Sequence, residues 1–278
     1  QVFIGLGYKV FNNLSVGANF SYLYGDITHQ SMTTIGATDT RSIKLDKFSI
    51  SDYKLDFGLQ YTYKLNKKNT INIGAVYTLG RTLHGDAYKY HQTGAESNGS
   101  IYVQSQTGDT IPNPFKMPHT FGIGLTYVYD NRLTIGVDYT LQKWNTADLA
   151  WSKFNKESVE MNSRTKIAFG AEFVPSYISH NYLKRIRYRM GAYYSSPYNK
   201  VSYTSPDTGT TSFQDGAREY GVSIGFGLPM FQSKSMLNIS GQYIKVSPKF
   251  KGLMEENYLR INIGLTFNER WFMKWKVD

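Results

Sequence analysis

The stretch from Met117 to Trp144 alternates large apolar residues with small or polar ones in two runs, separated by Asp130-Asn131. Every second residue is apolar or aromatic from Phe121 to Tyr129, and again from Leu133 to Leu141. A period of two over about ten residues places all the apolar side chains on one face of a β-strand. Because an Asp-Asn pair favours a tight turn, the stretch is predicted to be a β-hairpin.

The rest of the chain repeats this pattern, and eleven strands are expected along its 278 residues. Short and long connections alternate, as they do in outer-membrane barrels with short periplasmic turns and long external loops. The sequence therefore predicts an all-β fold, with residues 1–278 forming a single antiparallel transmembrane β-barrel domain in the outer membrane of a Gram-negative bacterium. The external loops are expected at about 26–48, 84–118, 145–163, 195–217 and 246–256.

Composition narrows the class of protein. Cysteine is absent, which excludes disulfides and thiolate metal sites. No apolar run reaches about 18 residues, which excludes transmembrane helices. Aromatic residues make up 15% of the chain, as expected if Tyr lines the membrane interfaces.

The formal charge of +10 fits attraction to membrane lipids and lipopolysaccharide, although a merely solvated basic surface would also account for it. No basic run is interleaved with aromatic residues as nucleic-acid binding requires, so no nucleic-acid partner is expected.

The chain begins at Gln1 in the middle of an expected strand, without Met or a signal peptide. Barrels of this class have an even number of strands. An odd number of further strands is therefore expected before Gln1, unless another chain closes the barrel.

Three segments resemble the FadL/OmpP1/TodX family of outer-membrane transporters for long-chain fatty acids and other hydrophobic compounds. They are the Met117-Pro118 entry into Phe121–Leu125 with the following strand to Trp144, the start Val2–Tyr24, and the close Ile261–Trp271. The resemblance implies about fourteen strands in the complete barrel, with an N-terminal hatch upstream of Gln1. It also implies that loops 26–48 and 84–118 offer hydrophobic ligands a landing surface.

Two groups of residues are candidates for ligand binding. The apolar residues of the second loop are expected to capture a hydrophobic solute, or else to pack the loop onto the barrel rim. They are Ile101, Tyr102, Val103, Phe115 and Met117. On the inner face, Arg187, Arg189 and Arg260 are expected to hold a substrate carboxylate. The alternative is an internal charge network with Asp56, Asp138 and Glu172.

These observations predict passive outer-membrane transport of hydrophobic small molecules, with no catalytic residues, no metal and no cofactor. His84, Asp86 and Asp109 are too scattered to indicate a catalytic set and are interpreted as rim residues. Two alternatives stay open. One is a general porin for polar solutes, and the other is a structural or secretion-associated barrel that binds a protein partner at its external loops.

Overall fold

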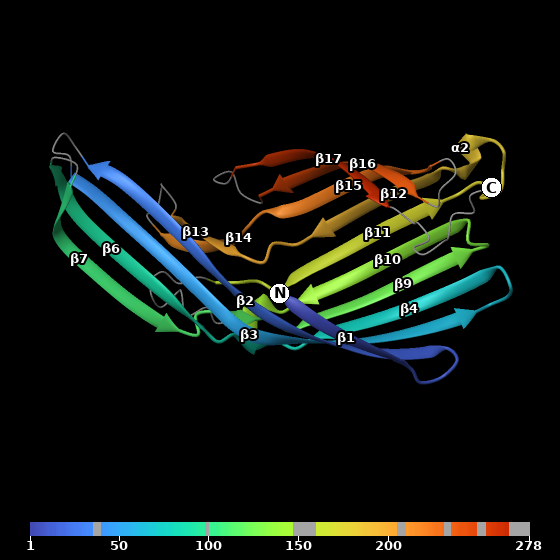
Figure 1. Ribbon diagram of the computed structural model, residues 1–278, viewed down its shortest axis with the longest axis horizontal. Coiled ribbons are helices and arrows are strands. Elements are labelled where there is room, and N and C mark those ends of the chain that lie inside the picture. The colour runs from blue at the N-terminus through green and yellow to red at the C-terminus, as the bar shows by residue number, and fades with distance from the viewer. Residues whose placement is uncertain are drawn as a thin grey trace, which may run out of the picture.

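A computed structural model describes residues 1–35, 40–97, 100–146, 160–204, 210–230, 235–248 and 254–266 (Figure 1). The strands are β1 (Val2–Lys9), β2 (Leu14–Ile35), β3 (Thr40–Lys64), β4 (Asn69–Thr78), β5 (Arg81–Thr82), β6 (Gly85–Ser97), β7 (Ser100–Pro112), β8 (Lys116–Met117), β9 (Thr120–Tyr129), β10 (Leu133–Gln142), β11 (Arg164–Phe173), β12 (Arg187–Ser195), β13 (Lys200–Thr204), β14 (Thr211–Asp215), β15 (Arg218–Pro229), β16 (Met236–Ser247) and β17 (Glu256–Thr266). Two short helices, η1 (Trp144–Thr146) and α2 (Tyr182–Arg185), complete the secondary structure of these residues. Neither they nor any other described helix could cross a bilayer.

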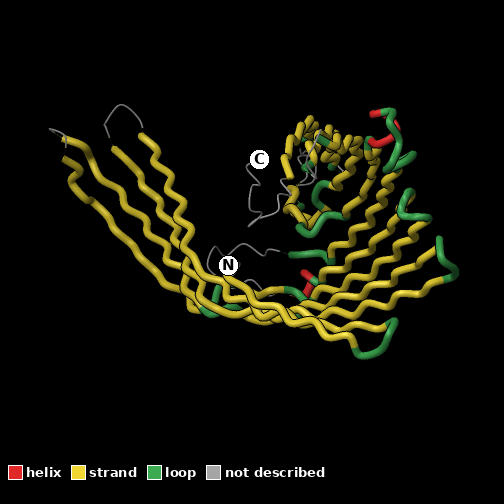
Figure 2. The backbone as a smooth tube through the Cα atoms, turned by 45° about the vertical axis from the view of Figure 1, so that its right-hand side comes forward, coloured by secondary structure: helices red, strands yellow, loops and turns green. Residues whose placement is uncertain are grey.

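One antiparallel sheet of 13 strands makes up most of the molecule. Eleven of its strands follow one another in the order β1-β2-β3-β4-β9-β10-β11-β12-β15-β16-β17, which confirms the predicted count. The sheet curls into the wall of a barrel (Figure 2). Within the described residues, β1 and β17 each pair with one neighbour and form the two edges of this wall. The hatch and the additional strands stay predictions.

The wall has an apolar outer face and a small or polar inner face. On β9, Ile123 and Leu125 are 57% and 50% exposed, and Ile263 on β17 is 72% exposed. Such exposed rows cross the wall in register, as where Leu125 lies opposite Ile73 and Val137. Large apolar side chains open to the surroundings on every second residue are typical of a lipid-facing surface.

At one end of the barrel, which we call the short-turn end, tight turns join neighbouring strands, as predicted. Between β9 and β10, Asp130 and Asn131 have φ values of 51° and 52°. This left-handed conformation suits Asp and Asn and matches the twist of the two strands. The predicted Met117–Trp144 hairpin is thus confirmed in strand pairing and in turn.

The expected strict alternation of short and long connections is wrong at one place. The connection 174–186 between β11 and β12 lies at the short-turn end, yet it includes helix α2. It is longer than the connection 248–255 between β16 and β17 at the opposite end. Its Pro, Ser and Asn residues end the period-two pattern of β11, but they do not indicate how long the connection is. A tight turn and a small folded loop contain the same residue types.

The same sheet continues beyond the barrel wall as a four-stranded extension, which we call the blade: Leu23–Ile35 of β2, Thr40–Asp52 of β3, β6 and β7. Strand β2 has 22 residues, or about 73 Å at about 3.3 Å per residue, whereas a membrane-spanning strand needs only about 9–11 residues. The blade therefore reaches about 40 Å beyond the bilayer. In Figures 1 and 2 it is a single layer that leans away from the barrel.

The segments predicted as external loops at 26–48 and 84–118 are mostly strand in the structure. The blade strands carry Thr, Ser, Gln, His and Lys on both faces, because neither face is covered. Without one buried face, the apolar alternation that indicates a strand is lost, although β-branched and aromatic residues still favour one.

The other expected loops are described only in part. Segment 195–217 contains the hairpin of β13 and β14. Most of 145–163 lies outside the described residues, and so do 249–253 within 246–256.

A buried carboxylate joins the blade to the barrel wall. Asp52 is 4% exposed and accepts hydrogen bonds from the backbone N–H groups of Tyr53 (2.7 Å) and His84 (2.8 Å). The His84 ring (3.0 Å) and the Arg81 guanidinium (3.4 Å) lie against the same carboxylate. Arg81 and His84 belong to the segment that leads from β4 into β6. Asp52 therefore fixes the point where the strand paired with β3 changes from β4 to β6.

The exposed apolar row of β3 begins at Tyr53, and Asp52 precedes it on the blade side. Burial alone would raise the pKa of Asp52, but the hydrogen bonds from His84 and Tyr53 and the charge of Arg81 outweigh it. Together they hold the pKa of this carboxyl below its ordinary value.

Candidate functional site

The inner face of the wall has two unlike halves. On β1 to β10 the middle of this face is built from small residues that align across the strands, with Gly7 opposite Gly17, Gly17 opposite Gly58, and Gly74 opposite Gly124, whereas Lys54, Asp56 and Lys64 of β3 lie on the same face toward the strand ends. We call this half the smooth wall. Because the glycine positions carry no side chain, they leave room for a solute next to the backbone.

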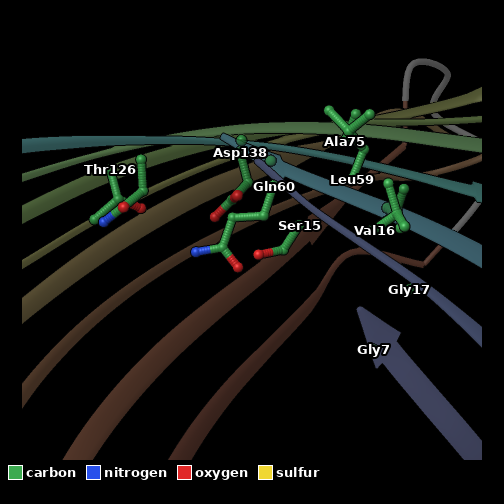
Figure 3. Close-up of a pocket in the computed structure, with 14 residues that line it drawn as sticks. Gly7, Ser15, Val16, Gly17, Leu59, Gln60, Ala75, Thr126 and Asp138 are labelled. Atoms are coloured by element: carbon green, nitrogen blue, oxygen red, sulfur yellow. The ribbon is translucent and has the colours of Figure 1, made fainter. Parts of the chain in front are cut away.

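A hollow of about 490 Å³ lies against the smooth wall. Its polar lining comes from Ser15, Gln60, Asn72, Thr126 and Asp138. Figure 3 shows Ser15, Gln60, Thr126 and Asp138 gathered beside the bare ribbon of the glycine positions. The Asp138 carboxylate occupies the space beside Gly124, since an added Cβ there would lie 2.4 Å from its Oδ1.

The other half, on β11 to β17, carries charges, and we call it the charged strip. At its centre Glu172 binds two arginines, with Arg187 Nη1 to Oε1 at 3.1 Å and Arg189 Nε to Oε2 at 2.7 Å. Arg189 also donates from Nη1 to Oδ1 of Asn238 at 2.8 Å, reaching across β15 to β16. Gly225 of β15 lies opposite Arg189, and its missing side chain leaves room for this contact.

A second cluster of the charged strip is centred on Tyr193. Its hydroxyl donates to Glu219, and the Lys166 ammonium lies 4.7 Å from the centre of its ring. Near them, Arg164 Nε donates to Ser195 Oγ at 2.8 Å. The ring lies over Gly221, where an added Cβ would come within 2.0 Å of Tyr193 Cε1, so only glycine fits there.

The charged strip has an excess of positive charge. Five cationic side chains belong to it, against three carboxylates, Glu172, Glu219 and Glu256. The cations are Arg164, Lys166, Arg187, Arg189 and Arg260. A bore with this lining favours solutes that carry a negative group.

The structure brings together some of the predicted site residues and separates others. Arg187 and Arg189 share Glu172, as the charge-network alternative describes, and Arg260 on β17 is close enough to Tyr193 to interact with it electrostatically. Asp56, a further member expected in that network, instead pairs with Lys54 at 2.8 Å.

Those of the predicted capture residues whose side chains the structure describes lie at three different places. Val103 lies on the blade and is 50% exposed. Phe115 packs against Phe48 at the base of the blade, with ring centres 5.4 Å apart. Met117 belongs to β8 and pairs with Arg81. Ile101 and Tyr102 have their backbone in β7, and their side chains lie outside the described part of the chain.

Tyr193 was missed as a site residue, as were Arg164, Glu219 and Asn238. The sequence could have indicated Tyr193, because it lies an even number of residues from Arg187 and Arg189 along β12. It therefore faces the inside of the barrel, as they do. Among the described residues, no cluster of His, Asp and Glu has the geometry to hold a metal ion.

Comparison with known families gives one match that covers the whole chain. The family model described as BamG matches residues 1–278. Among the curated proteins, none matches the sequence.

Solved structures with a similar fold include a monoaromatic hydrocarbon channel and a FadL homologue. The "TodX deltaS2S3 mutant monoaromatic hydrocarbon channel" superposes with a TM-score of 0.55 at 13% identity, over 94% of this chain and 67% of that chain. A Pseudomonas aeruginosa FadL homologue gives a TM-score of 0.52 at 13% identity, over 89% of this chain and 59% of that one. The chain thus spans about three fifths to two thirds of the length of these channels.

At this identity the similarity shows the fold alone. It confirms the predicted antiparallel β-barrel of the outer-membrane type, and it supports the FadL resemblance at the level of architecture. The matching family model carries a different family name.

Proposed function

The chain belongs to the BamG family, and we propose that it forms a passive outer-membrane channel for hydrophobic small molecules that carry an anionic group. The observation that carries this proposal is the division of the inner face into the smooth wall and the charged strip. An elongated apolar solute can lie against glycine backbone while its anionic end faces arginine side chains. The similar barrels described as hydrocarbon channels support the hydrophobic part of the proposal.

Arg187 and Arg189 are the proposed contacts for the anionic group. Glu172 neutralises one positive charge of the pair, so one remains. Each guanidinium has five N–H donors, and the contacts with Glu172 and Asn238 use only part of them. Arg260 of β17 is also a proposed contact for the anionic group, on the side of the charged strip away from Glu172.

Transport into proteoliposomes tests this proposal. The solutes are a fluorescent long-chain fatty acid, its methyl ester, and a sugar of similar size. We expect the acid to enter fastest, and Arg189→Gln to slow its entry about tenfold while the ester is unaffected, as for the loss of one charge-assisted hydrogen bond. Lys67→Gln removes a charge in a short turn outside the bore and serves as the control. Equal entry of acid, ester and sugar would rule out the proposal in favour of a general porin.

The blade favours a second candidate, a barrel that binds a protein partner. It reaches beyond the bilayer, and β7 is an edge strand within the described residues. Apart from Asp109, β7 has no charged residue to protect that edge from pairing with another strand. Residues Met32 and Tyr88 on one face of the blade are 52% and 38% exposed.

A strand of a partner protein that pairs with β7 would explain this edge. The test is cross-linking from position 104 of β7 in the full-length protein, followed by purification and mapping of the product. Gln106→Lys should abolish a specific, stoichiometric cross-link, because a lysine on an edge strand opposes pairing with another strand. A cross-link that persists in this variant would exclude strand pairing at β7.

A further inference from the structure

The connection 174–186 at the short-turn end is a built structure rather than a slack turn. At its base, Val174 is fully buried and its N–H donates to the Arg132 carbonyl at 2.8 Å. The two sides of the connection are joined by a hydrogen bond from Ser176 N–H to the Lys184 carbonyl, also at 2.8 Å. The Asn181 side chain caps helix α2. These contacts hold the connection in one shape.

This connection presents large apolar side chains to its surroundings. Ile178 is 93% exposed and Leu183 is 62% exposed. Side chains of this kind at the tip of an ordered loop are costly in water, and they become favourable where the loop touches lipid.

A contact with the outer wall places the connection beside the bilayer. Tyr188 belongs to the lipid-facing row of β12, where it packs edge-on against Phe226 with ring centres 5.9 Å apart. Its hydroxyl donates to the Leu183 carbonyl at 3.0 Å. Helix α2 therefore adjoins the lipid-facing side of the barrel at one end of the strands, which is the level of the head groups.

The same connection forms a hollow of about 720 Å³ with both kinds of charge on its rim. Arg132 and Lys184 supply the cations, Ser176 and Ser179 supply hydroxyls, and Asp130 supplies one carboxylate. Arg132 already donates to the Val174 and Pro175 carbonyls, which fixes the guanidinium at the hollow. Cations and hydroxyls suit a phosphate group, and the carboxylate suits an ammonium group.

We propose that this hollow binds a phospholipid of the surrounding bilayer whose head group carries a phosphate and a primary ammonium. Lys184 and Arg132 bind the phosphate, Asp130 accepts hydrogen bonds from the ammonium, and Ile178 and Leu183 contact the acyl region. The site anchors the short-turn end of the barrel at a fixed depth. It is independent of the solute that crosses the barrel, so failure of the proposed transport would leave it untouched.

Native mass spectrometry of the full chain in detergent tests the site, with dioleoylphosphatidylethanolamine and dioleoylphosphatidylcholine as probes. We expect retention of phosphatidylethanolamine in preference to phosphatidylcholine, since three methyl groups remove the N–H donors that Asp130 requires. Lys184→Gln should weaken retention of both lipids about tenfold, the size of one lost charge-assisted hydrogen bond. Asp130→Asn, which keeps a residue suited to positive φ, should remove only the preference between them.

Lys67→Gln, in another short turn at the same end, is the matched control and should retain lipid like the parent chain. Equal retention of both lipids by the parent chain, or unchanged retention in Lys184→Gln, would overturn the proposal. So would displacement of the lipid by phosphoethanolamine at equal concentration, because the site would then recognise a free head group. Circular dichroism of each variant checks that the barrel is folded.

Discussion

Replacing Asp52 with Asn should release the blade from the barrel without unfolding the wall. The carboxylate accepts four contacts from Tyr53, His84 and Arg81 and is almost completely buried. An amide can replace only one oxygen, and its NH₂ group would face a donor, either the His84 N–H or the Tyr53 N–H. Removing one partner of a buried charge pair costs about 3–5 kcal/mol, and relaxation toward water at the junction reduces this to about 2–3 kcal/mol.

Hydrogen–deuterium exchange measures this loss locally. A destabilisation of about 2–3 kcal/mol raises the rate of exchange by about 30- to 150-fold where exchange follows local opening. We expect this increase in β6 and in the facing part of β3, with no change in β9 and β10. Asp86→Asn is the matched control, because Asp86 is an exposed carboxylate close to the same junction. If Asp52→Asn left β6 as protected as before, or raised exchange equally in blade and wall, the junction would not depend on this carboxylate.

Three further predictions concern the junction and the wall. Because the pKa of Asp52 is lowered in the folded chain, this carboxylate stabilises the blade at every pH above its ordinary pKa of 3.8. The stabilisation is lost as the pH falls through the lowered value. Hydrogen exchange in β6, followed from pH 6 downward, should therefore lose protection only below pH 3.8. Gly85→Ala should disturb the start of β6, since an added Cβ would meet the Ser49 carbonyl oxygen at 2.1 Å, whereas Gly74→Ala has open space and should leave the melting temperature unchanged. Leu125→Arg on the outer face should destabilise the barrel by about 2–4 kcal/mol in denaturant titrations in lipid vesicles, while Thr126→Arg, facing the hollow on the next residue, should be tolerated; similar losses for both would contradict the assignment of faces.

The eleven strands of the wall could be predicted from sequence because each has one face in lipid. Apolar residues at every second position of β9 and β10 are a direct consequence of that environment, and the register follows once Asp130-Asn131 fixes the turn. The same reasoning failed for the blade, whose strands meet water on both sides. There the paired residues Lys44, His91 and Thr107 give no apolar alternation to detect.

The alternation of side chains along a strand also determines which residues of the charged strip could be predicted from the sequence. It places Arg187, Arg189 and Arg260 on the inner face, as predicted, and it would have placed Tyr193 there too. The partners of these residues could not be foreseen, because Arg189 reaches Asn238 across an intervening strand. That contact depends on the strand order β12-β15-β16 and on its register, which no local pattern encodes.

Among the described residues, the blade meets the wall along one line, where β2 and β3 run on from the wall into the blade, β3 passing Asp52, and where β6 starts at Gly85. A rigid arm about 40 Å long acts as a lever on that line. A rotation of about 10° at its foot, less than the ordinary twist between two neighbouring strands, would sweep the tip through about 7 Å. A few hydrogen bonds around one carboxylate thus set the position of a surface that lies far from them.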